Sequence, residues 1–170
     1  MSLLYNGLPV ALKIGIIILM LFLFRDDVKF RHISLWQLVL ALLLVVSLGL
    51  LSIAWQTLLT YAAINISIIG FQLVVVWAYF SIKNKRVIAL TSHYLGLGDI
   101  LIMIVYCFCL WPPYFVLFLI VSCLISIISF TIYQQLHKEA VQTIPFAGIM
   151  ALIYAGCLVC SLVFNSCSFL

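Results

Sequence analysis

The fold is decided near the N-terminus by residues 8–24, LPVALKIGIIILMLFLF, and by the polar residues that follow them, 25–32, RDDVKFRH. The first run is apolar except for Lys13. About 20 apolar residues in a helix cross the hydrocarbon core of a bilayer, which is about 30 Å thick. The stretch therefore predicts a membrane-spanning helix that ends in a charged segment at the membrane surface.

The same pattern recurs along the whole chain. Because backbone groups in lipid must satisfy one another and these runs are continuously apolar rather than alternating, each is expected to be a helix and not a barrel strand. We predict an all-α, polytopic membrane protein: a six-transmembrane-helix bundle that forms one domain over residues 1–170. The later spans are expected at Ile33–Trp55, Leu58–Ile82, Val87–Trp111, Tyr114–Tyr133 and Ile144–Phe164.

The composition agrees with this prediction. The chain has 170 residues, of which 68% are hydrophobic and 7% charged, with a mean hydropathy of +1.38. A soluble domain has about 45–50% apolar and about 25% charged residues, so a soluble fold is excluded. The net charge of +4 is the difference between eight Lys and Arg and four Asp and Glu residues, and the basic residues are scattered, seven of them over short loops, which excludes a nucleic-acid-binding protein.

The basic residues predict the orientation. The segments after the second and fourth spans, Gln56-Thr57 and Pro112-Pro113, carry no charge. By the positive-inside rule the other connections are cytoplasmic and both termini lie on the outer face. Lys13 is expected to snorkel to the outer surface. The connections after the first, third and fifth spans hold the remaining basic residues, namely Arg25, Lys29, Arg31, Lys83, Lys85, Arg86 and Lys138.

Acidic residues are rare, and three of the four mark a candidate site. Asp99 follows Gly96-Leu97-Gly98 within an apolar span. An acid within a membrane span is costly and therefore a functional candidate, although Asp99 at a shallow depth would simply be solvated. The topology brings Asp99 to the same face and depth as Asp26 and Asp27, where two carboxylates sharing one proton supply a general base and a general acid.

Neighbouring residues leave alternatives open. Asp26 and Asp27 point about 100° apart on a helix, so topology does not choose between them. Gly96 and Gly98 permit either the approach of a substrate backbone or close helix packing. Pro145 and Phe146 open the last span, either as a tight junction near the aspartates or as an ordinary proline-initiated helix.

Three segments together resemble the type IV prepilin peptidases, bacterial membrane aspartic proteases with a Gly-x-Gly-Asp motif. Residues 27–33, DVKFRHI, resemble the first-aspartate motif of that family. Gly96-Leu97-Gly98-Asp99 resembles the second, and Ile144-Pro145-Phe146-Ala147 resembles the proline–aromatic segment near its last helix. Ser34 departs from the pattern, because the family usually has proline there.

The resemblance implies that Asp27 and Asp99 are the catalytic pair, that Gly96 and Gly98 shape the substrate channel, and that Pro145 and Phe146 border the site. It further implies an aspartic endopeptidase of the bacterial inner membrane that removes the short basic leader of pilin-like precursors at the cytoplasmic boundary. No metal or cofactor is implied. Bifunctional members of the family also have N-methyltransferase activity and an extra cytoplasmic domain with two Cys-x-x-Cys pairs. Neither is expected here, because the first cytoplasmic connection is short and the cysteines lie within or beyond the spans.

Two other functions fit parts of the pattern. A small transporter or channel subunit would use Asp99 as an intramembrane proton or cation site and would not need Asp27. A lipoprotein signal peptidase shares the two-aspartate chemistry, but that family has four spans and acts at the outer face, where no acid is expected here.

Overall fold

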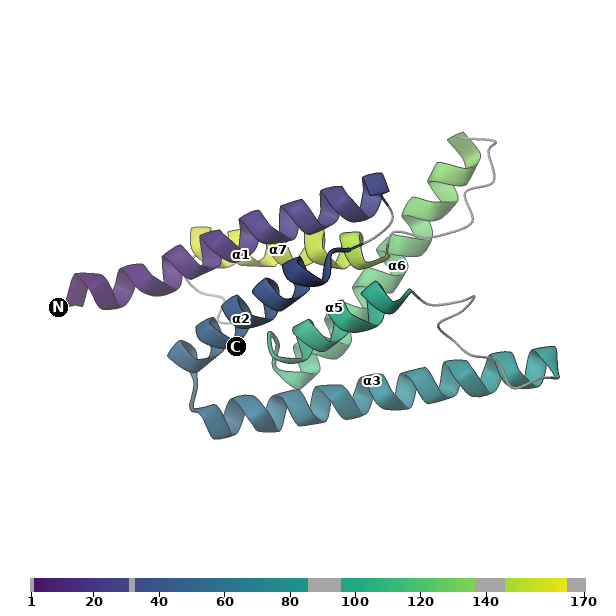
Figure 1. Cartoon of the computed structure of the whole chain (residues 1–170), viewed down its shortest axis with the longest axis horizontal. Coiled ribbons are helices and arrows are strands. Elements are labelled where there is room, and N and C mark those ends of the chain that lie inside the picture. Colours follow the sequence, from purple (N-terminus) through teal and green to yellow (C-terminus); the bar gives the residue numbers. More distant parts are fainter. Residues whose placement is uncertain (1, 31–32, 86–95, 137–145, 165–170) are drawn as a thin grey trace.

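A computed structural model describes residues 2–30, 33–85, 96–136 and 146–164. The described residues form helices and short connections without a strand (Figure 1), so the prediction of an all-α bundle is confirmed. The helices are α1 (Ser2–Phe30), α2 (Leu35–Ser52), α3 (Trp55–Asn84), α5 (Leu97–Cys107), α6 (Pro112–Leu136) and α7 (Phe146–Phe164).

Five of these helices, α1, α2, α3, α6 and α7, are long and apolar enough to cross a membrane. The fourth predicted span, Val87–Trp111, differs from the prediction. Its described part is helical only over the 11 residues of α5, which at 1.5 Å per residue cover about 16 Å. Residues 86–95 lie outside the described part of the chain.

The first helix is longer than its apolar run. It continues beyond Phe24, where the apolar span was expected to end, through the charged residues to Phe30. Arg and Lys are good helix formers, and Lys29 lies in the last turn, where a positive charge interacts favourably with the helix dipole. The acidic residues Asp26 and Asp27 therefore lie on the last two turns of α1.

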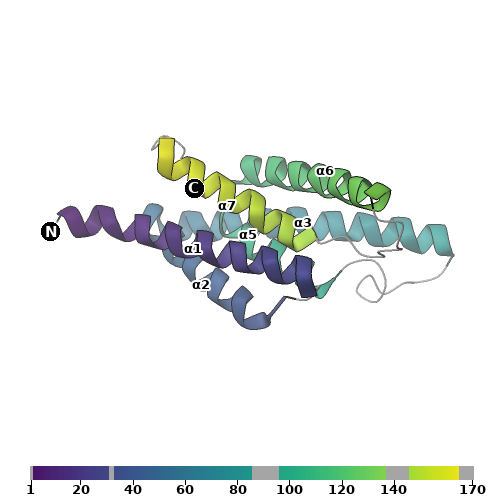
Figure 2. The same ribbon diagram turned by 90° about the horizontal axis from the view of Figure 1, so that it is seen from above.

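The core is built around α1 and α7, which lie side by side in both views (Figures 1 and 2) and make the most extensive contact of any two helices. Ile16, Met20 and Leu23 face inward from α1. Lys13 on α1 donates a hydrogen bond to Ser161 Oγ on α7 at 3.2 Å. The lysine that was expected to snorkel outward thus contacts the neighbouring helix.

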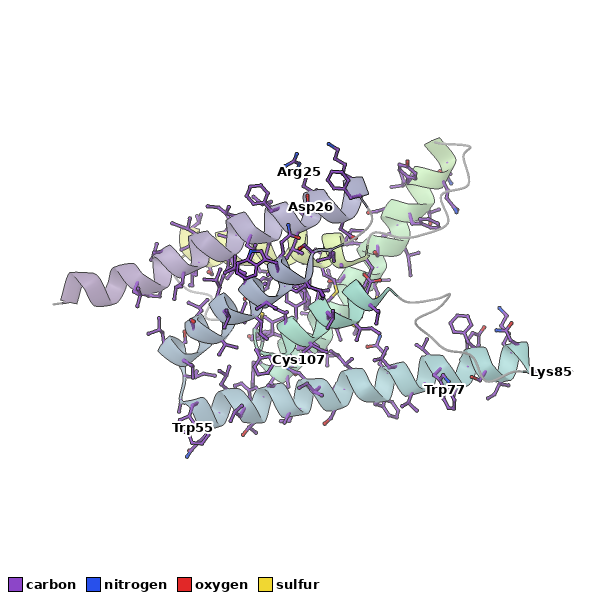
Figure 3. All side chains as sticks on the ribbon, in the orientation of Figure 1. Arg25, Asp26, Trp55, Trp77, Lys85 and Cys107 are labelled. Atoms are coloured by element: carbon purple, nitrogen blue, oxygen red, sulfur yellow. The ribbon has the colours of Figure 1, made fainter. Side chains whose placement is uncertain are left out.

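The third helix borders the bundle, and it is the least buried of the five spanning helices. Its one fully buried polar residue, Asn65, donates from Nδ2 to the backbone oxygens of Cys107, at 3.0 Å, and Leu110, at 2.8 Å. These oxygens belong to the end of α5, where Cys107 lies close to α3 (Figure 3), and to the turn into α6. Asn65 thereby satisfies backbone groups that helical hydrogen bonds leave open.

Basic residues gather at one end of the bundle. Arg25 and Lys29 near the end of α1, and Lys83 and Lys85 near the end of α3, lie toward the end of the bundle at which α5 and α7 begin (Figures 1 and 3). Arg31, Arg86 and Lys138 lie outside the described residues. We call this end, with the first turns of α5 and α7, the basic end of the bundle.

Candidate active site

Asp27 lies in the last turn of α1 at the basic end, and its side chain is 8% exposed. It faces α7, where the backbone N–H of Gly148 donates to Asp27 Oδ2 at 2.6 Å. A short bond from a backbone donor to a carboxylate is charge-assisted and strong. The first residue of the predicted pair is thus fixed against the start of the last helix.

Asp99 reaches the same helix from α5. The backbone N–H of Ala147 donates to Asp99 Oδ1 at 3.0 Å. Asp99 is the third residue of α5, and it also accepts a hydrogen bond from the backbone of Gly96, which caps that helix. An acidic side chain that folds back to the capping residue satisfies one of the free donors of a helix start.

The two carboxylates therefore converge on consecutive backbone amides. Ala147 and Gly148 lie in the first turn of α7, where the N–H groups have no partner inside the helix and the helix dipole favours negative charge. One turn of one helix thus holds acidic side chains that are 121 and 48 residues away from their donors. The structure thus brings both carboxylates to the same end of the bundle, as expected from the topology.

The environment of Asp99 alters its proton affinity. Asp99 lies in the first turn of α5, outside the five spanning helices. Burial, and secondly the negative charge of Asp27, raise the pKa of Asp99 from 3.8 to about 6, against the opposing effect of the hydrogen bonds from Ala147 and Gly96. The charge of Asp27 thus makes ionisation of Asp99 less favourable, and Asp99 keeps its proton up to about pH 6.

Glycines make room for both aspartates. A Cβ atom on Gly148 would lie 2.9 Å from Asp27 Oδ2, and one on Gly96 would lie 3.0 Å from Asp99 Oδ2. A Cβ on Gly98 would lie 3.3 Å from Cδ1 of Ile33, a residue just before α2. Gly96 thus accommodates the carboxyl of Asp99, and Gly98 allows close packing, which was one of its two expected roles.

Asp26 is separated from this pair. It accepts a hydrogen bond from Gln37 Nε2 of α2 at 2.6 Å, and its side chain is only partly buried. Adjacent side chains on a helix diverge by about 100°. The geometry therefore distinguishes between two neighbours that the topology left equivalent, and Asp27 is the one held at the start of α7, next to the amide that binds Asp99.

The remaining predicted site residues are less informative. Phe146 begins α7 and packs partly buried against the core, while Pro145 lies outside the described residues. Among the described residues no three His, Cys, Asp or Glu side chains cluster as metal ligands do. The cysteines in this part of the chain are free, and Cys107 and Cys109 are fully buried.

Sequence reasoning missed the residues that hold the carboxylates. Ala147 and Gly148 contribute backbone N–H groups, which no side-chain motif reveals. The available signal was indirect: a proline followed by small residues at the start of an apolar span. Gln37 gave no signal at all, because nothing in its sequence neighbourhood points to Asp26.

No protein-family model, no curated protein and no solved structure matches the chain, so these comparisons identify no family.

Proposed function

We propose that this membrane protein is an aspartic endopeptidase that cleaves the short basic leader of type IV pilin-like precursors at the cytoplasmic membrane boundary. The observation that carries the proposal is the convergence of Asp27 and Asp99 on the consecutive amides of Ala147 and Gly148. Paired carboxyls with one proton between them supply the base and the acid that peptide hydrolysis requires.

The chemistry needs only these groups and water. The ionised carboxylate takes a proton from water as the water oxygen bonds to the peptide carbonyl carbon, and the protonated carboxyl gives its proton to the carbonyl oxygen. The carbon–nitrogen bond then breaks as the amine receives the proton taken from water. The second carboxyl recovers its proton from the tetrahedral intermediate, so the pair returns to its starting state without a covalent acyl-enzyme.

The position of the pair supports this class of substrate. A basic leader stays on the cytoplasmic side while the apolar helix after it enters the bilayer, so the bond between them lies at the membrane boundary. The carboxyls lie at the basic end of the bundle rather than halfway along the spans. Because the exposed side chains of Arg25 and Lys29 repel a basic leader, recognition relies on the apolar helix and the peptide backbone.

The test is cleavage of a co-expressed precursor that carries a basic leader, a glycine and an apolar helix. Asp27→Asn and Asp99→Asn are each expected to lower cleavage by about 10²–10⁴-fold, because each removes one partner of acid–base catalysis. Asp26→Asn is the matched control. The amide that it introduces retains an oxygen that can accept from Gln37, so cleavage should persist.

Other outcomes would redirect the assignment. Full cleavage by both the Asp27 and the Asp99 variant would end the peptidase proposal. Dependence on Asp99 with indifference to Asp27, together with ion flux in liposomes, would instead favour the transporter or channel in which Asp99 is a proton or cation site.

A further inference from the structure

We propose that the first turn of α7 gives the two aspartates different roles: Gly148 holds Asp27 in the ionised form that activates water, and Asp99 carries the shared proton. The division of roles rests on the proposed peptidase function. It makes Gly148 a positioning residue that acts through Asp27.

The two hydrogen bonds to α7 are unequal. Asp27 accepts from Gly148 at 2.6 Å, whereas Asp99 accepts from Ala147 at 3.0 Å. A backbone N–H only donates, so it stabilises an ionised carboxylate over a protonated one. The shorter bond favours negative charge on Asp27, and it acts against the desolvation of a residue that is 8% exposed.

The setting of Asp99 favours the proton. Its desolvation is the largest effect on its pKa, and the charge of Asp27 acts in the same direction. The groups that oppose protonation of Asp99 are the N–H donors of Ala147 and Gly96. Their combined effect is smaller, because the pKa still rises to about 6.

The packing ties Asp27 to the absence of a side chain at Gly148. A Cβ at this position would lie 2.9 Å from Asp27 Oδ2 and 3.1 Å from Asp27 Cβ, and the ring of Phe24 would lie 3.4 Å away. Because α1 and α7 form the most extensive helix contact, the backbones have little freedom to separate. Even a methyl group at residue 148 is therefore expected to displace the Asp27 carboxylate from its donor.

The first test compares pH profiles of kcat/KM for Gly148→Ala and Gly156→Ala. Both glycines lie on α7, but a Cβ at Gly156 meets no atom within 4 Å, so this variant should match the wild type. In Gly148→Ala the ionised form of Asp27 loses its donor. The displaced charge of Asp27 then lies farther from Asp99, which lowers the pKa of Asp99. The active pH range should narrow from both sides, and the maximal kcat should fall. A Gly148→Ala enzyme with wild-type limits and kcat would overturn the proposal.

A second measurement does not depend on cleavage or on the folding of the glycine variant. Infrared difference spectra between about pH 5 and about pH 7.5 detect a carboxyl that loses its proton near the pKa of Asp99, about 6. The band should vanish in Asp99→Asn and persist in Asp27→Asn, shifted to lower pH by loss of the neighbouring charge. A band that vanishes in Asp27→Asn and persists in Asp99→Asn would reverse the roles.

The two failures can be told apart. If the wild-type chain leaves the precursor uncut but shows the expected infrared pattern, the peptidase function is wrong while the placement of the proton stands. If it cuts the precursor but the pattern is reversed, the function stands and the division of roles is wrong.

Discussion

Helix ends inside this apolar bundle satisfy their free backbone groups in two opposite ways. At the start of α7 the open groups are N–H donors, and the carboxylates of Asp27 and Asp99 satisfy them. At the end of α5 and in the turn after it the open groups are carbonyl oxygens, and the Asn65 amide satisfies two of them. Each of these contacts joins helices that are distant in sequence, because a helix end in an apolar surrounding must find its partners elsewhere.

The difference lies in what the side chains can do besides bonding. The amide of Asn65 is neutral and has no proton to exchange, so its contribution is to stability. The carboxyls repel one another and compete for a proton, which raises the pKa of Asp99 and costs stability when both are ionised. The paired acids thus carry an electrostatic cost that the Asn65 amide does not, and such perturbed carboxyls are typical of functional sites.

The largest expected effect concerns pH. If Asp99 must be protonated, kcat/KM should decline above about pH 6, by about tenfold for each further pH unit. The sign follows from the raised pKa, since the required form is the acid and is lost as pH rises. Steady-state cleavage in detergent or nanodiscs from about pH 5 to about pH 8 tests this. A rate that increases over this whole interval would contradict the assignment of Asp99 as the proton carrier.

The melting temperature tests the same difference between an acidic and an amide side chain. Asp99→Asn removes the desolvated charge that the folded protein carries above about pH 6, so the variant should melt at a higher temperature than the wild type at about pH 8. The difference should shrink at about pH 5, where the wild-type side chain is protonated. A variant that melts below the wild type at both pH values would show that the carboxylate stabilises the fold.

Asn65→Leu is expected to have the opposite signature. It leaves the carbonyl oxygens of Cys107 and Leu110 without their donor, at a cost of about 1–3 kcal/mol. It also removes the buried Asn65 Oδ1, which has no partner among the described residues, but the loss of two hydrogen bonds outweighs this gain. Yield and melting temperature should fall, while the kcat of the folded fraction stays close to that of the wild type. The control is Ser67→Ala on the exposed face of the same helix, where Oγ donates to the Ala63 carbonyl of its own helix and bonds to no other described residue. Equal losses in the two variants would remove the special role of Asn65.

The smallest effect is expected from Gln37→Leu. It breaks the hydrogen bond to Asp26, but it also removes the buried Gln37 Oε1, which has no partner among the described residues. These changes oppose each other, so the melting temperature and kcat should change little. Loss of cleavage comparable to that of Asp27→Asn would mean that the Asp26–Gln37 contact takes part in the site.

Long apolar runs made most of the fold predictable. Five of the predicted spans are long helices whose ends lie within about six residues of the prediction, because chain length and apolarity fix the number of crossings. The prediction was least accurate where charge and proline mark boundaries. The polar segment after Phe24 stays helical to Phe30, and the turn expected at Gln56-Thr57 lies at Ile53-Ala54 instead.

The candidate site was only partly predictable. An isolated acid among glycines and apolar residues pointed to Asp99, and topology brought it to the level of the paired aspartates. The resemblance to a peptidase motif favoured Asp27 over its neighbour, and the geometry independently distinguishes them. The backbone donors of Ala147 and Gly148 were not predictable, because any residue except proline carries an N–H group, and only its position in space makes it a partner.

By itself, the sequence determined that the chain is a helical membrane protein with its rare acids and most of its bases toward one end, because hydropathy and charge act along the chain and need no knowledge of neighbours. Only the tertiary structure decided which carboxylates converge on α7, which donors hold them and which glycines make room for them. Those relations depend on the rotation of one helix against another, and a rotation of about 100° exchanges Asp26 for Asp27.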